Sequence, residues 1–543
     1  MMGSMVIIKF CLRYINRKKS KFIIYILGNI IIAGLSILVA YFTGLFIDRL
    51  INEKTSAFLL HFSIIFVALN VINIIMKYTN SIIYMKLLYD HTYFISRDVI
   101  KHIHCVPLLQ IEKMDAAYLN QRISQDSGTL IGFAMSAISG FATNLLIIVI
   151  VFTIMLSISF AITLLILCFL IIYLVLFITF KKPLYKKGLE LKEDQGFYFS
   201  KMFEQLNFAR FVKIHSAKEL FKKRLHDAYD AYRKSLLNYH RISTLFSSLD
   251  NFVVTLINVF LFIIFGITII NGSVTVGEFI IFTALSTKLV GSFSYFFNFG
   301  KTYQDTLVSY NRINDILQWE VEENGLDTIF DIHSIKLDNL RFSFGEKEVI
   351  RDFSMKLERG KMYAIVGDNG KGKSTLMNLL MGVYTTQVGE IYFNDERLKD
   401  LDSEELRKNK LGIVEQEPTL LNDTMLYNIG LEPEDRIEIS NITQIFKILD
   451  LNEFIQRLPE GLDTVICSKS TNISGGEKQK LALARLLIKN TDVMIFDEPT
   501  SALDESTTNS FIDYIEQIKK NKIIIIITHT TKLMKQCDVI VKI

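Results

Sequence analysis

An apolar run leads into a glycine-rich turn at Tyr363-Ala364-Ile365-Val366-Gly367-Asp368-Asn369-Gly370-Lys371-Gly372-Lys373-Ser374-Thr375, and the residues that follow have the pattern of a helix. Gly367 and Gly372 stand at the G-x-x-x-x-G-K-S spacing of a phosphate-binding loop, whose glycines let backbone N–H groups surround an anion. The N-terminus of the helix adds a partial positive charge. This segment therefore predicts a nucleotide site, in which Lys373 reaches the β- and γ-phosphates and the Ser374 hydroxyl binds Mg²⁺. The alternative is an ordinary glycine turn between a strand and a helix.

The composition indicates a membrane protein joined to a water-soluble part. Of the 543 residues, 50% are hydrophobic, and the mean hydropathy of +0.31 exceeds that of an ordinary soluble protein. The apolar excess lies in the part of the chain before the phosphate-binding loop. A net charge of +4 offers no argument for a nucleic-acid partner. The five cysteines are far apart and form no C-x-x-C pair, so neither a disulfide framework nor a zinc site is predicted.

Apolar stretches of membrane-spanning length fill the first part of the chain. A helix needs about 20 apolar residues to cross about 30 Å of hydrocarbon, and six such stretches together are rare in a soluble protein. We therefore predict an all-α transmembrane domain of six long helices. The predicted spans are Phe22–Ile47, Ala57–Met76, Thr129–Leu156, Ile158–Phe180, Phe252–Ile270 and Phe279–Phe299.

The joints between these spans predict the orientation of the chain. Asp48–Ser56, Ser157–Ser159 and Asn271–Glu278 are short and poor in Lys and Arg, whereas the other two joints are long and basic. By the positive-inside rule, both termini and the long joints are cytoplasmic. Before the first span, Val6–Lys21 is a basic amphipathic segment suited to lying on a membrane surface.

The two long joints have helical periodicity, which predicts that the membrane helices continue into the cytoplasm. Each excursion should contain a short transverse segment near its tip, at Leu109–Tyr118 and at Asn207–Ala217. We interpret these segments as coupling helices that touch the nucleotide-binding domain. The alternative is plain solvated helix.

A polar linker follows Trp319, and we place the domain boundary within it, giving a transmembrane domain at residues 1–325 and a nucleotide-binding domain at residues 326–543. Beyond the linker, strands and helices alternate. Met362–Val366, Val493–Phe496 and Lys522–Thr528 are short apolar runs of the kind buried in parallel sheets. The second domain is therefore predicted to be an α/β P-loop domain.

Two further motifs carry chemistry. Asp497 and Glu498 end an apolar strand, where Asp497 would hold Mg²⁺ and Glu498 would polarise the water that attacks the γ-phosphate. Ser474-Gly475-Gly476-Glu477 precedes a helix and predicts a second anion site. One nucleotide does not need two such sites in one domain. Two domains facing each other would, if each serine–glycine turn closed on phosphates held by its partner.

These motifs together resemble an ATP-binding cassette exporter of the half-transporter type, with a transmembrane domain fused to a nucleotide-binding domain. The resemblance covers nearly the whole chain and includes R-x-S-x-D at Arg122, Ser124 and Asp126. It implies that Gly367 to Thr375 form the Walker A loop and Ser474 to Glu477 the signature turn. Ser501 to Asp504 correspond to the D-loop.

The resemblance also implies a role for each matching residue. The catalytic residues would be Glu498 as base, His529 as the switch histidine that contacts the γ-phosphate, and Lys373. Magnesium would be held by Ser374, Asp497 and the Q-loop residue Gln416. The implied ATP-binding residues are Phe344, Gly367, Asp368, Asn369, Gly370, Lys371, Gly372, Lys373, Ser374, Thr375, Gln416, Ser474, Gly475, Gly476 and Glu477.

Some positions leave alternatives open or depart from the family pattern. Phe344 would stack on adenine, or it is a core aromatic of a half-buried strand. His529 could instead be a structural histidine at a strand end. Glu477 stands where glutamine is usual, and Ser468 replaces a carboxylate that normally contacts the coupling helices.

The implied function is ATP-driven export, with a homodimer as the simplest assembly because one chain carries every motif; a heterodimer is the alternative. Lys288, scattered asparagines and aromatic residues such as Tyr295 in the membrane helices favour a small bacteriocin-like peptide as substrate. Interhelical packing is the structural alternative for these residues. Export of drugs or lipids and a nucleotide-gated channel or regulator remain as other functions. The Ile-, Lys- and Asn-rich composition indicates a bacterial cell membrane.

Overall fold

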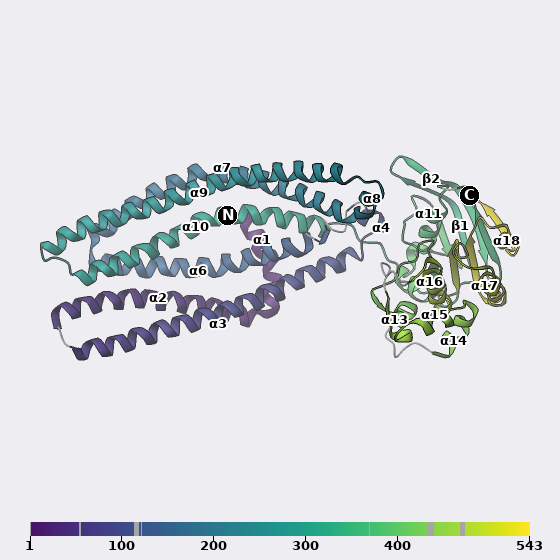
Figure 1. Ribbon diagram of the computed structural model, residues 1–543, viewed down its shortest axis with the longest axis horizontal. Coiled ribbons are helices and arrows are strands. Elements are labelled where there is room, and N and C mark those ends of the chain that lie inside the picture. Colours follow the sequence, from purple (N-terminus) through teal and green to yellow (C-terminus); the bar gives the residue numbers. More distant parts are fainter. Residues whose placement is uncertain are drawn as a thin grey trace. The chain divides into compact units, whose positions relative to one another are not determined.

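The computed structural model describes residues 2–53, 56–112, 114, 119–120, 122–368, 370–431, 439–466 and 473–543. The chain forms two compact units (Figure 1). The first, or helical unit, contains Met1–His104 and Met114–Trp319, and the second, or α/β unit, contains Cys105–Lys113 and Glu320–Ile543.

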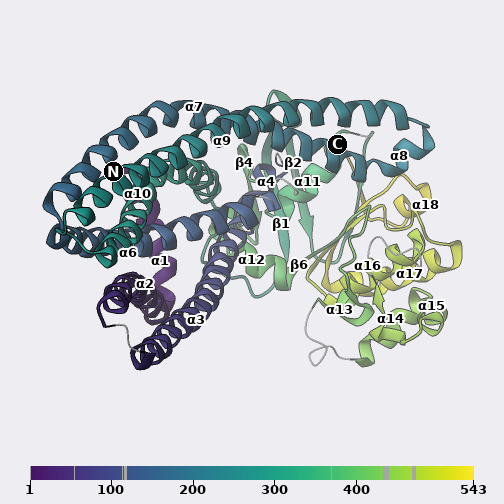
Figure 2. The same cartoon turned by 60° about the vertical axis from the view of Figure 1, so that its left-hand side comes forward.

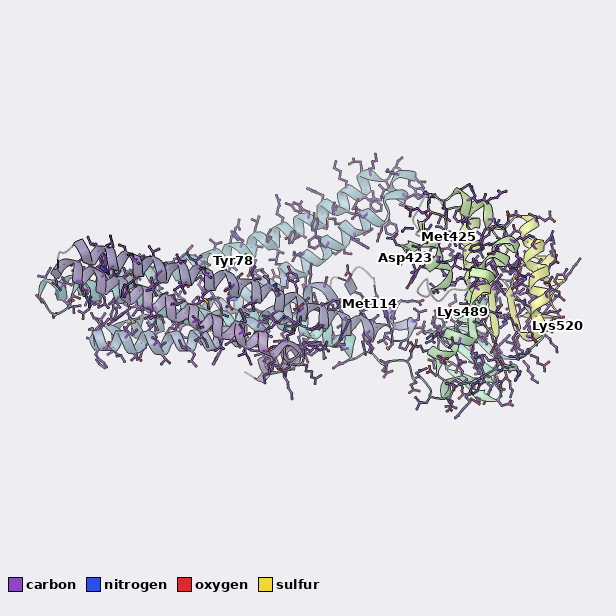
Figure 3. The ribbon with its side chains drawn as sticks, turned by 90° about the horizontal axis from the view of Figure 1, so that it is seen from below. Tyr78, Met114, Asp423, Met425, Lys489 and Lys520 are labelled. Carbon is purple, nitrogen blue, oxygen red and sulfur yellow. The ribbon has the colours of Figure 1, made fainter. Side chains whose placement is uncertain are left out.

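Six long helices of 32 to 53 residues build the described part of the helical unit. α2 packs along α3, α7 packs along α9, and α10 lies against both α2 and α6 (Figures 1 and 2). Side chains project along the whole length of these helices, as at Tyr78, which is 68% exposed (Figure 3). The helices are α2 (Lys19–Glu53), α3 (Ser56–Ile103), α6 (Ser127–Ile158), α7 (Phe160–Asn207), α9 (Lys218–Ile270) and α10 (Val276–Leu317).

Five segments of the described chain are long and apolar enough to cross a membrane. They contain four of the six predicted spans whole and nearly all of a fifth, Ala57–Met76, which begins two residues earlier than its segment. The remaining span, Ile158–Phe180, falls in α7 apart from its first two residues, and the side chains at 165, 168, 170, 173 and 177 of this helix are outside the described residues. The five segments are Val6–Asn52, Leu59–Ile103, Arg122–Ile158, Lys218–Ile270 and Val276–Gly300.

The predicted short joints are confirmed where the structure describes them. Ser159 is extended and separates α6 from α7, and its hydroxyl caps α7. At the joint before α10, Thr275 and Glu278 form a capping box. The Asp48 carboxylate of α2 accepts hydrogen bonds from Gly277 N and Thr275 Oγ1, both at 2.6 Å. A carboxylate at a helix N-terminus is favoured by the free N–H groups there, so this contact fastens α2 to α10.

The N-terminal helix α1 (Met2–Ile15) packs its apolar face against the helical unit. Its apolar side chains Ile7, Cys11 and Ile15 are at most 1% exposed, because they pack in a core shared with α3, α6 and α10. These three apolar side chains therefore pack against protein, and the position of Val6–Lys21 at a membrane surface stays a prediction. The basic side chains of Lys9 and Arg13 remain exposed on the opposite side.

Both long joints continue as helix, as predicted, and each contains a short helix near its tip: α4 (Leu108–Ile111) and α8 (Ala209–Ile214). The predicted first segment extends into residues 113 and 115–118, which lie outside the described residues. Between α4 and α6, the motif residues Arg122 to Asp126 form a π-helical turn. α4 belongs to the α/β unit, where Leu108 and Leu109 pack against its apolar core.

Two main sheets form the α/β unit. The antiparallel sheet has the order β2-β1-β4-β5, and the parallel sheet has the order β11-β3-β10-β9-β6. The short strands β7 (Asp423–Thr424) and β8 (Val465–Ile466) pair separately. The main strands are β1 (Ser334–Phe344), β2 (Lys347–Glu358), β3 (Met362–Val366), β4 (Val388–Phe393), β5 (Glu396–Arg397), β6 (Leu411–Val414), β9 (Val493–Asp497), β10 (Ile523–Ile527) and β11 (Val539–Lys542).

Alternating side chains of the parallel strands supply two cores, one on each face of the sheet. Met494 and Ile524 enter one core, whereas Val493 and Ile523 enter the other. Because both faces are buried, these strands are apolar throughout, which confirms the predicted parallel sheet. The helices of this unit are α11 (Lys373–Leu380), α12 (Ser403–Glu405), α13 (Met425–Gly430), α14 (Ile439–Ile448), α15 (Asn452–Arg457), α16 (Gly475–Lys489), α17 (Glu505–Ile518) and α18 (Thr531–Met534), together with α4.

Candidate functional site

The glycine-rich loop connects β3 to α11, as the spacing predicts. Gly372 caps α11 with φ of +95°, and a Cβ atom there would lie 2.8 Å from Val349 Cγ1. Gly370 also has a positive φ, of +83°. Both the conformation and the lack of space require glycine at position 372, which leaves the N-terminal N–H groups of α11 uncovered. Asn369 lies outside the described residues.

Lys373 holds this loop in its curled shape. Its ammonium donates to the carbonyl oxygens of Gly367, at 2.7 Å, and Asp368, at 3.2 Å. The same ammonium lies 3.2 Å from His529 Nε2, just beyond β10. The Lys373 ammonium thus lies between the loop and His529, at the edge of the parallel sheet where β3 and β10 end. Thr375 is buried inside α11, whereas Lys371 is exposed.

Asp497, the last residue of β9, faces the start of α11. Ser374 Oγ lies 3.4 Å from its Oδ2 atom. Burial raises the pKa of the Asp497 carboxyl above its ordinary value, and the neighbouring Glu498 carboxylate raises that pKa further. The Ser374 hydroxyl and the Lys373 ammonium act in the opposite direction. Burial and Glu498 thus oppose ionisation of Asp497, which a cation bound beside it would favour.

A hydroxyl and a desolvated carboxylate are oxygen donors of the kind that Mg²⁺ prefers. The described residues contain no group of three or more His, Cys, Asp or Glu side chains that could hold a metal ion. Magnesium usually takes only one or two carboxylates, together with water and phosphate oxygens. The residues around Asp497 therefore fit Mg²⁺ bound with a nucleotide.

Glu498 lies at the centre of the predicted catalytic residues. Gln416 Nε2 donates to its Oε2 atom at 3.0 Å, and His529 Nε2 is 3.7 Å from its Oε1 atom. Its backbone has φ of +48°, which is unusual for a residue with a side chain. The strained turn is held by hydrogen bonds from Glu498 N to the Ile527 carbonyl and from the Ser501 hydroxyl to the Glu498 carbonyl. Loops after β6, β9 and β10 thus place three predicted residues together.

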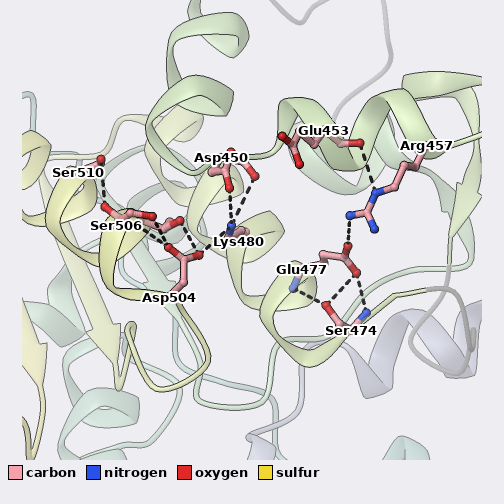
Figure 4. Close-up of polar contacts among 10 residues, drawn as sticks. Asp450, Glu453, Arg457, Ser474, Glu477, Lys480, Asp504, Ser506 and Ser510 are labelled. Carbon is pink, nitrogen blue, oxygen red and sulfur yellow. Dashed lines mark hydrogen bonds and ion pairs between the residues drawn. The ribbon is translucent and has the colours of Figure 1, made fainter.

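The signature turn forms the N-terminus of α16. Ser474 Oγ accepts a hydrogen bond from Glu477 N and donates to Glu477 Oε2, which also accepts from Ser474 N (Figure 4). Arg457, at the end of α15, contacts the other carboxylate oxygen at 2.9 Å. Gly475 begins the helix, and a Cβ atom on Gly476 would lie 2.7 Å from the Ala502 carbonyl of the D-loop. Glu477, which stands where glutamine is usual, therefore completes the capping box of α16, and Arg457 neutralises its negative charge.

The D-loop is fastened to the same helix. Asp504 caps α17, and its carboxylate accepts hydrogen bonds from Ser506 and Thr507, which lower the pKa of this carboxyl. Lys480 lies 3.4 Å from Asp504 and 3.5 Å from Asp450, so it joins α16 to both (Figure 4). The helix that begins at the signature turn is thus joined to the D-loop through Lys480.

Phe344 ends β1 with its ring 41% exposed. It meets the rings of Phe342 and Tyr384 edge-on, while those two rings stack on each other. Phe342 is the buried core aromatic, at 1% exposure. The exposed ring of Phe344 is therefore free to take a stacking ligand, as the adenine interpretation requires.

Sequence reasoning missed the ionic partners of the motifs. Arg457 and Lys480 belong to no motif. The only signal for Arg457 is Glu477, because a carboxylate in a predicted anion site needs a cation beside it. Arg485 was also missed. It is half-buried in α16 and donates to the carbonyl oxygens of Asn428 and Thr419, which fixes the segment after Gln416.

The chain joins a helical unit, with segments long and apolar enough to cross a membrane, to a P-loop unit that has two separate predicted anion-binding turns. This combination places it among membrane proteins with a nucleotide-binding domain. Two known families match the chain: "ABC transporter transmembrane region" over residues 22–293 and "ABC transporter" over residues 350–501. The first match alone spans half of the chain. The protein belongs to the ABC transporter family.

Individual relatives are similar over about half of the chain. The alpha-hemolysin translocation ATP-binding protein of Escherichia coli is 30% identical over 277 residues, which are 50% of this chain and 39% of that protein. The ATP-dependent lipid A-core flippase of Pasteurella multocida is 31% identical over 275 residues, 50% of this chain and 47% of that protein. The lactococcin-G-processing and transport ATP-binding protein of Lactococcus lactis is 32% identical over 279 residues, 50% of this chain and 39% of that protein.

The chain covers 39% to 64% of the length of the first such relatives. Among solved structures, a bacterial Atm1-family ABC exporter with ATP bound matches with a TM-score of 0.83 at 21% identity, covering 97% of this chain and 93% of that one. This match confirms the predicted fold, a helical transmembrane domain followed by an α/β nucleotide-binding domain.

Proposed function

We propose that this protein is an ATP-driven exporter that works as a homodimer with two Mg·ATP sites. The observation that supports this most is the convergence of Lys373, Asp497, Glu498 and His529 at one sheet edge, in a chain that also carries the signature turn at Ser474. One edge supplies a complete hydrolytic set. The signature turn supplies phosphate ligands for a nucleotide bound by the partner chain.

In this proposal the residues of each chain have defined tasks. The loop N–H groups and Lys373 bind the β- and γ-phosphates, and Phe344 stacks on the adenine. Ser374, Gln416 and Asp497 hold Mg²⁺, which when bound would neutralise charge on the phosphates. Glu498 accepts a proton from the attacking water, and Gln416 and His529 fix the direction of its carboxylate. Closure of two chains places Ser474, Gly475, Gly476 and Glu477 over the phosphates and excludes water.

Movement of the α/β unit would reach the membrane through the coupling helices. α4 packs into the apolar core beside Tyr384, whose hydroxyl is 3.5 Å from Glu112. We place the transmembrane domain at residues 1–325 and the nucleotide-binding domain at 326–543, with both termini in the cytoplasm. The bilayer would be a bacterial cell membrane.

For the substrate we propose a small peptide, with lipid or drug-like molecules as the second candidate. The names of the relatives fit either, since one is a lactococcin-processing and transport protein and others are lipid A-core flippases. ATP binds the closed dimer in preference to separated chains, because only closure brings in the signature turn. ATP therefore drives closure, and hydrolysis reverses it.

ATP turnover by the purified protein in lipid tests this proposal. Glu498→Gln removes the base and keeps the shape, so turnover should fall by about a hundredfold or more while ATP still binds. Wild-type protein without turnover would refute the exporter proposal and favour a nucleotide-gated channel or regulator. Stimulation by a peptide, but not by lipid, would support the peptide substrate.

A further inference from the structure

Two of the chain segments that lead from the helical unit into the α/β unit meet at one place. Cys105 follows the end of α3, and Glu322 lies in the linker that follows α10. Glu322 N donates to the Cys105 carbonyl at 2.7 Å, so the two segments are joined through their backbones. A movement carried by either segment therefore reaches the same point of the α/β unit.

The linker is also fastened along a second segment of the α/β unit. Gly325 N donates to the Leu401 carbonyl at 3.0 Å, and Asp327 N donates to the Asp400 carbonyl at 3.2 Å. A Cβ atom on Gly325 would lie 2.0 Å from the Asp400 carbonyl, so glycine is required for this close approach. The linker is thus bound to the stretch of chain that leads into Arg407.

Arg407 connects this linker to the helix of the phosphate-binding loop. Its Nη2 atom lies 3.4 Å from Glu322 Oε2, and its Nη1 atom lies 3.1 Å from the Gly382 carbonyl and 3.5 Å from the Met381 carbonyl. These carbonyls close the C-terminal end of α11, where the last backbone acceptors of a helix lack partners and a cation is favoured. α11 begins at Lys373 and has 8 residues. It is therefore only about 12 Å long, and its other end is the phosphate-binding loop.

The helix of the signature turn ends at the same arginine. Lys489, the last residue of α16, donates from its ammonium to the carbonyl oxygens of Arg407, at 2.5 Å, and Leu411, at 2.9 Å. The two helices that begin at the predicted anion-binding turns therefore both end on Arg407. α11 meets its guanidinium, and α16 meets its carbonyl.

The contact between Arg407 and Glu322 is shielded from water. The two side chains expose only 29% and 27% of their surface. Burial raises the pKa of the Glu322 carboxyl above its ordinary value, whereas Arg407 acts in the opposite direction. A guanidinium has several donors in a planar fork, so it can bind a carboxylate and helix carbonyls at the same time, which an ammonium in its place does less well.

We propose that Arg407 is a positioning residue through which ATP binding at the phosphate-binding loop moves the linker that leads to α10. This inference rests on the proposed ATP-driven function and adds a second connection to the one through α4. A shift of α11 on nucleotide binding moves the guanidinium, and Glu322 moves with it. A shift of α16 reaches the same arginine through Lys489. The linker therefore responds to both anion-binding turns.

Hydrogen–deuterium exchange tests this connection without ATP turnover. The full-length protein with Glu498→Gln is placed in phosphatidylcholine nanodiscs and measured with and without Mg·ATP. Backbone amides of residues 320–327 report on the linker, and those of residues 373–382 report on α11. The variants added to this parent are Arg407→Gln, Arg407→Lys, Glu322→Gln, and Lys408→Gln as a matched control, because Lys408 is exposed in the same turn.

In the parent protein, Mg·ATP should slow exchange in both segments, and in the linker by about two- to fivefold, the scale on which a partly buried ion pair with its hydrogen bonds changes local opening. Arg407→Gln, Arg407→Lys and Glu322→Gln should each lose most of the linker response and keep that of α11. Combining Arg407→Gln with Glu322→Gln should add nothing, because both act on one contact. Lys408→Gln should keep both responses.

A linker response that persists in Glu322→Gln, or that is absent from the parent protein while α11 responds, would overturn the inference. If Arg407→Gln also disturbs α11, Glu322→Gln decides alone, because it leaves the contacts of Arg407 with α11 in place. Absence of any response of α11 in the parent protein would mean that the loop does not bind Mg·ATP. That result rejects the proposed function itself.

Discussion

At the scale of single residues, the pair Arg457–Glu477 makes a testable difference between this signature turn and the usual one. Arg457 is 70% exposed, so the ion pair adds little to stability, about 0–1 kcal/mol. Its electrostatic effect is larger, because an unpaired Glu477 beside the proposed phosphates would repel them. Arg457→Ala should therefore raise the KM for ATP by about three- to tenfold and change the melting temperature little. ATPase kinetics measure the first effect and thermal unfolding the second.

Glu477→Gln is the matched control for this prediction. The amide keeps the contacts with Ser474 but carries no charge, so the double variant Arg457→Ala, Glu477→Gln should recover the KM of the wild type. If the double variant stays as impaired as Arg457→Ala, the arginine acts by some route other than neutralising Glu477. The salt dependence of KM should also be weaker when both charges are absent.

The same residues show what a sequence can predict about this site. Walker A, Walker B and the signature turn are local motifs, so Lys373, Asp497 and Ser474 can be assigned from spacing. The contacts of Arg457 with Glu477, 20 residues away, and of Lys480 with Asp450, 30 residues away, arise only when α15 and the turn before it lie against α16. No local pattern encodes such pairs. The contact of Gln416 with Glu498 is partly predictable from the sequence. Both residues follow strands of one parallel sheet, so their strands predict the same sheet edge but not the hydrogen bond itself.

At the scale of elements, α4 couples a segment from between two membrane helices to the core of the α/β unit. Leu108 and Leu109 contribute apolar contacts there, each worth about 1 kcal/mol when half-buried. Leu108→Ala with Leu109→Ala should leave basal ATP turnover close to wild type and abolish its stimulation by transported substrate. Gln110→Ala, on the same helix, is the control and should keep the stimulation. Stimulation by transported substrate that persists in the double variant would contradict this role for α4.

Elements differ in how well the sequence predicts them. Long apolar helices and buried parallel strands follow from periodicity alone, because each must hide a continuous apolar surface. The position of α1 does not, since a basic amphipathic helix can face either lipid or protein. In this chain the apolar residues Ile7, Cys11 and Ile15 meet a complementary apolar surface on α3, α6 and α10. That surface exists only after the long helices have packed.

At the scale of the whole molecule, the proposed homodimer builds each ATP site from two chains, with Lys373 from one and Ser474 from the other. Lys373→Ala alone, or Ser474→Ala alone, disables both sites of a homodimer. In a mixed dimer of the two variants, one site has both substitutions and the other has neither. Random co-assembly makes half of the dimers mixed, so about a quarter of wild-type turnover should return if intact sites work independently.

Co-expression with two different affinity tags lets the mixed dimer be isolated, and its ATP turnover is then compared with that of each single variant. A matched control combines Lys373→Ala with Glu498→Gln. Both positions belong to the same chain's half of a site, so every site in that mixed dimer carries one defect and no turnover should return. Recovery in the first pair but not in the second is expected only if the signature turn acts across the dimer. Equal recovery in both pairs, or none in either, would contradict this assembly. It would mean that Ser474 serves the nucleotide of its own chain or that hydrolysis requires both sites to be intact. Either result would remove the physical basis on which ATP drives closure.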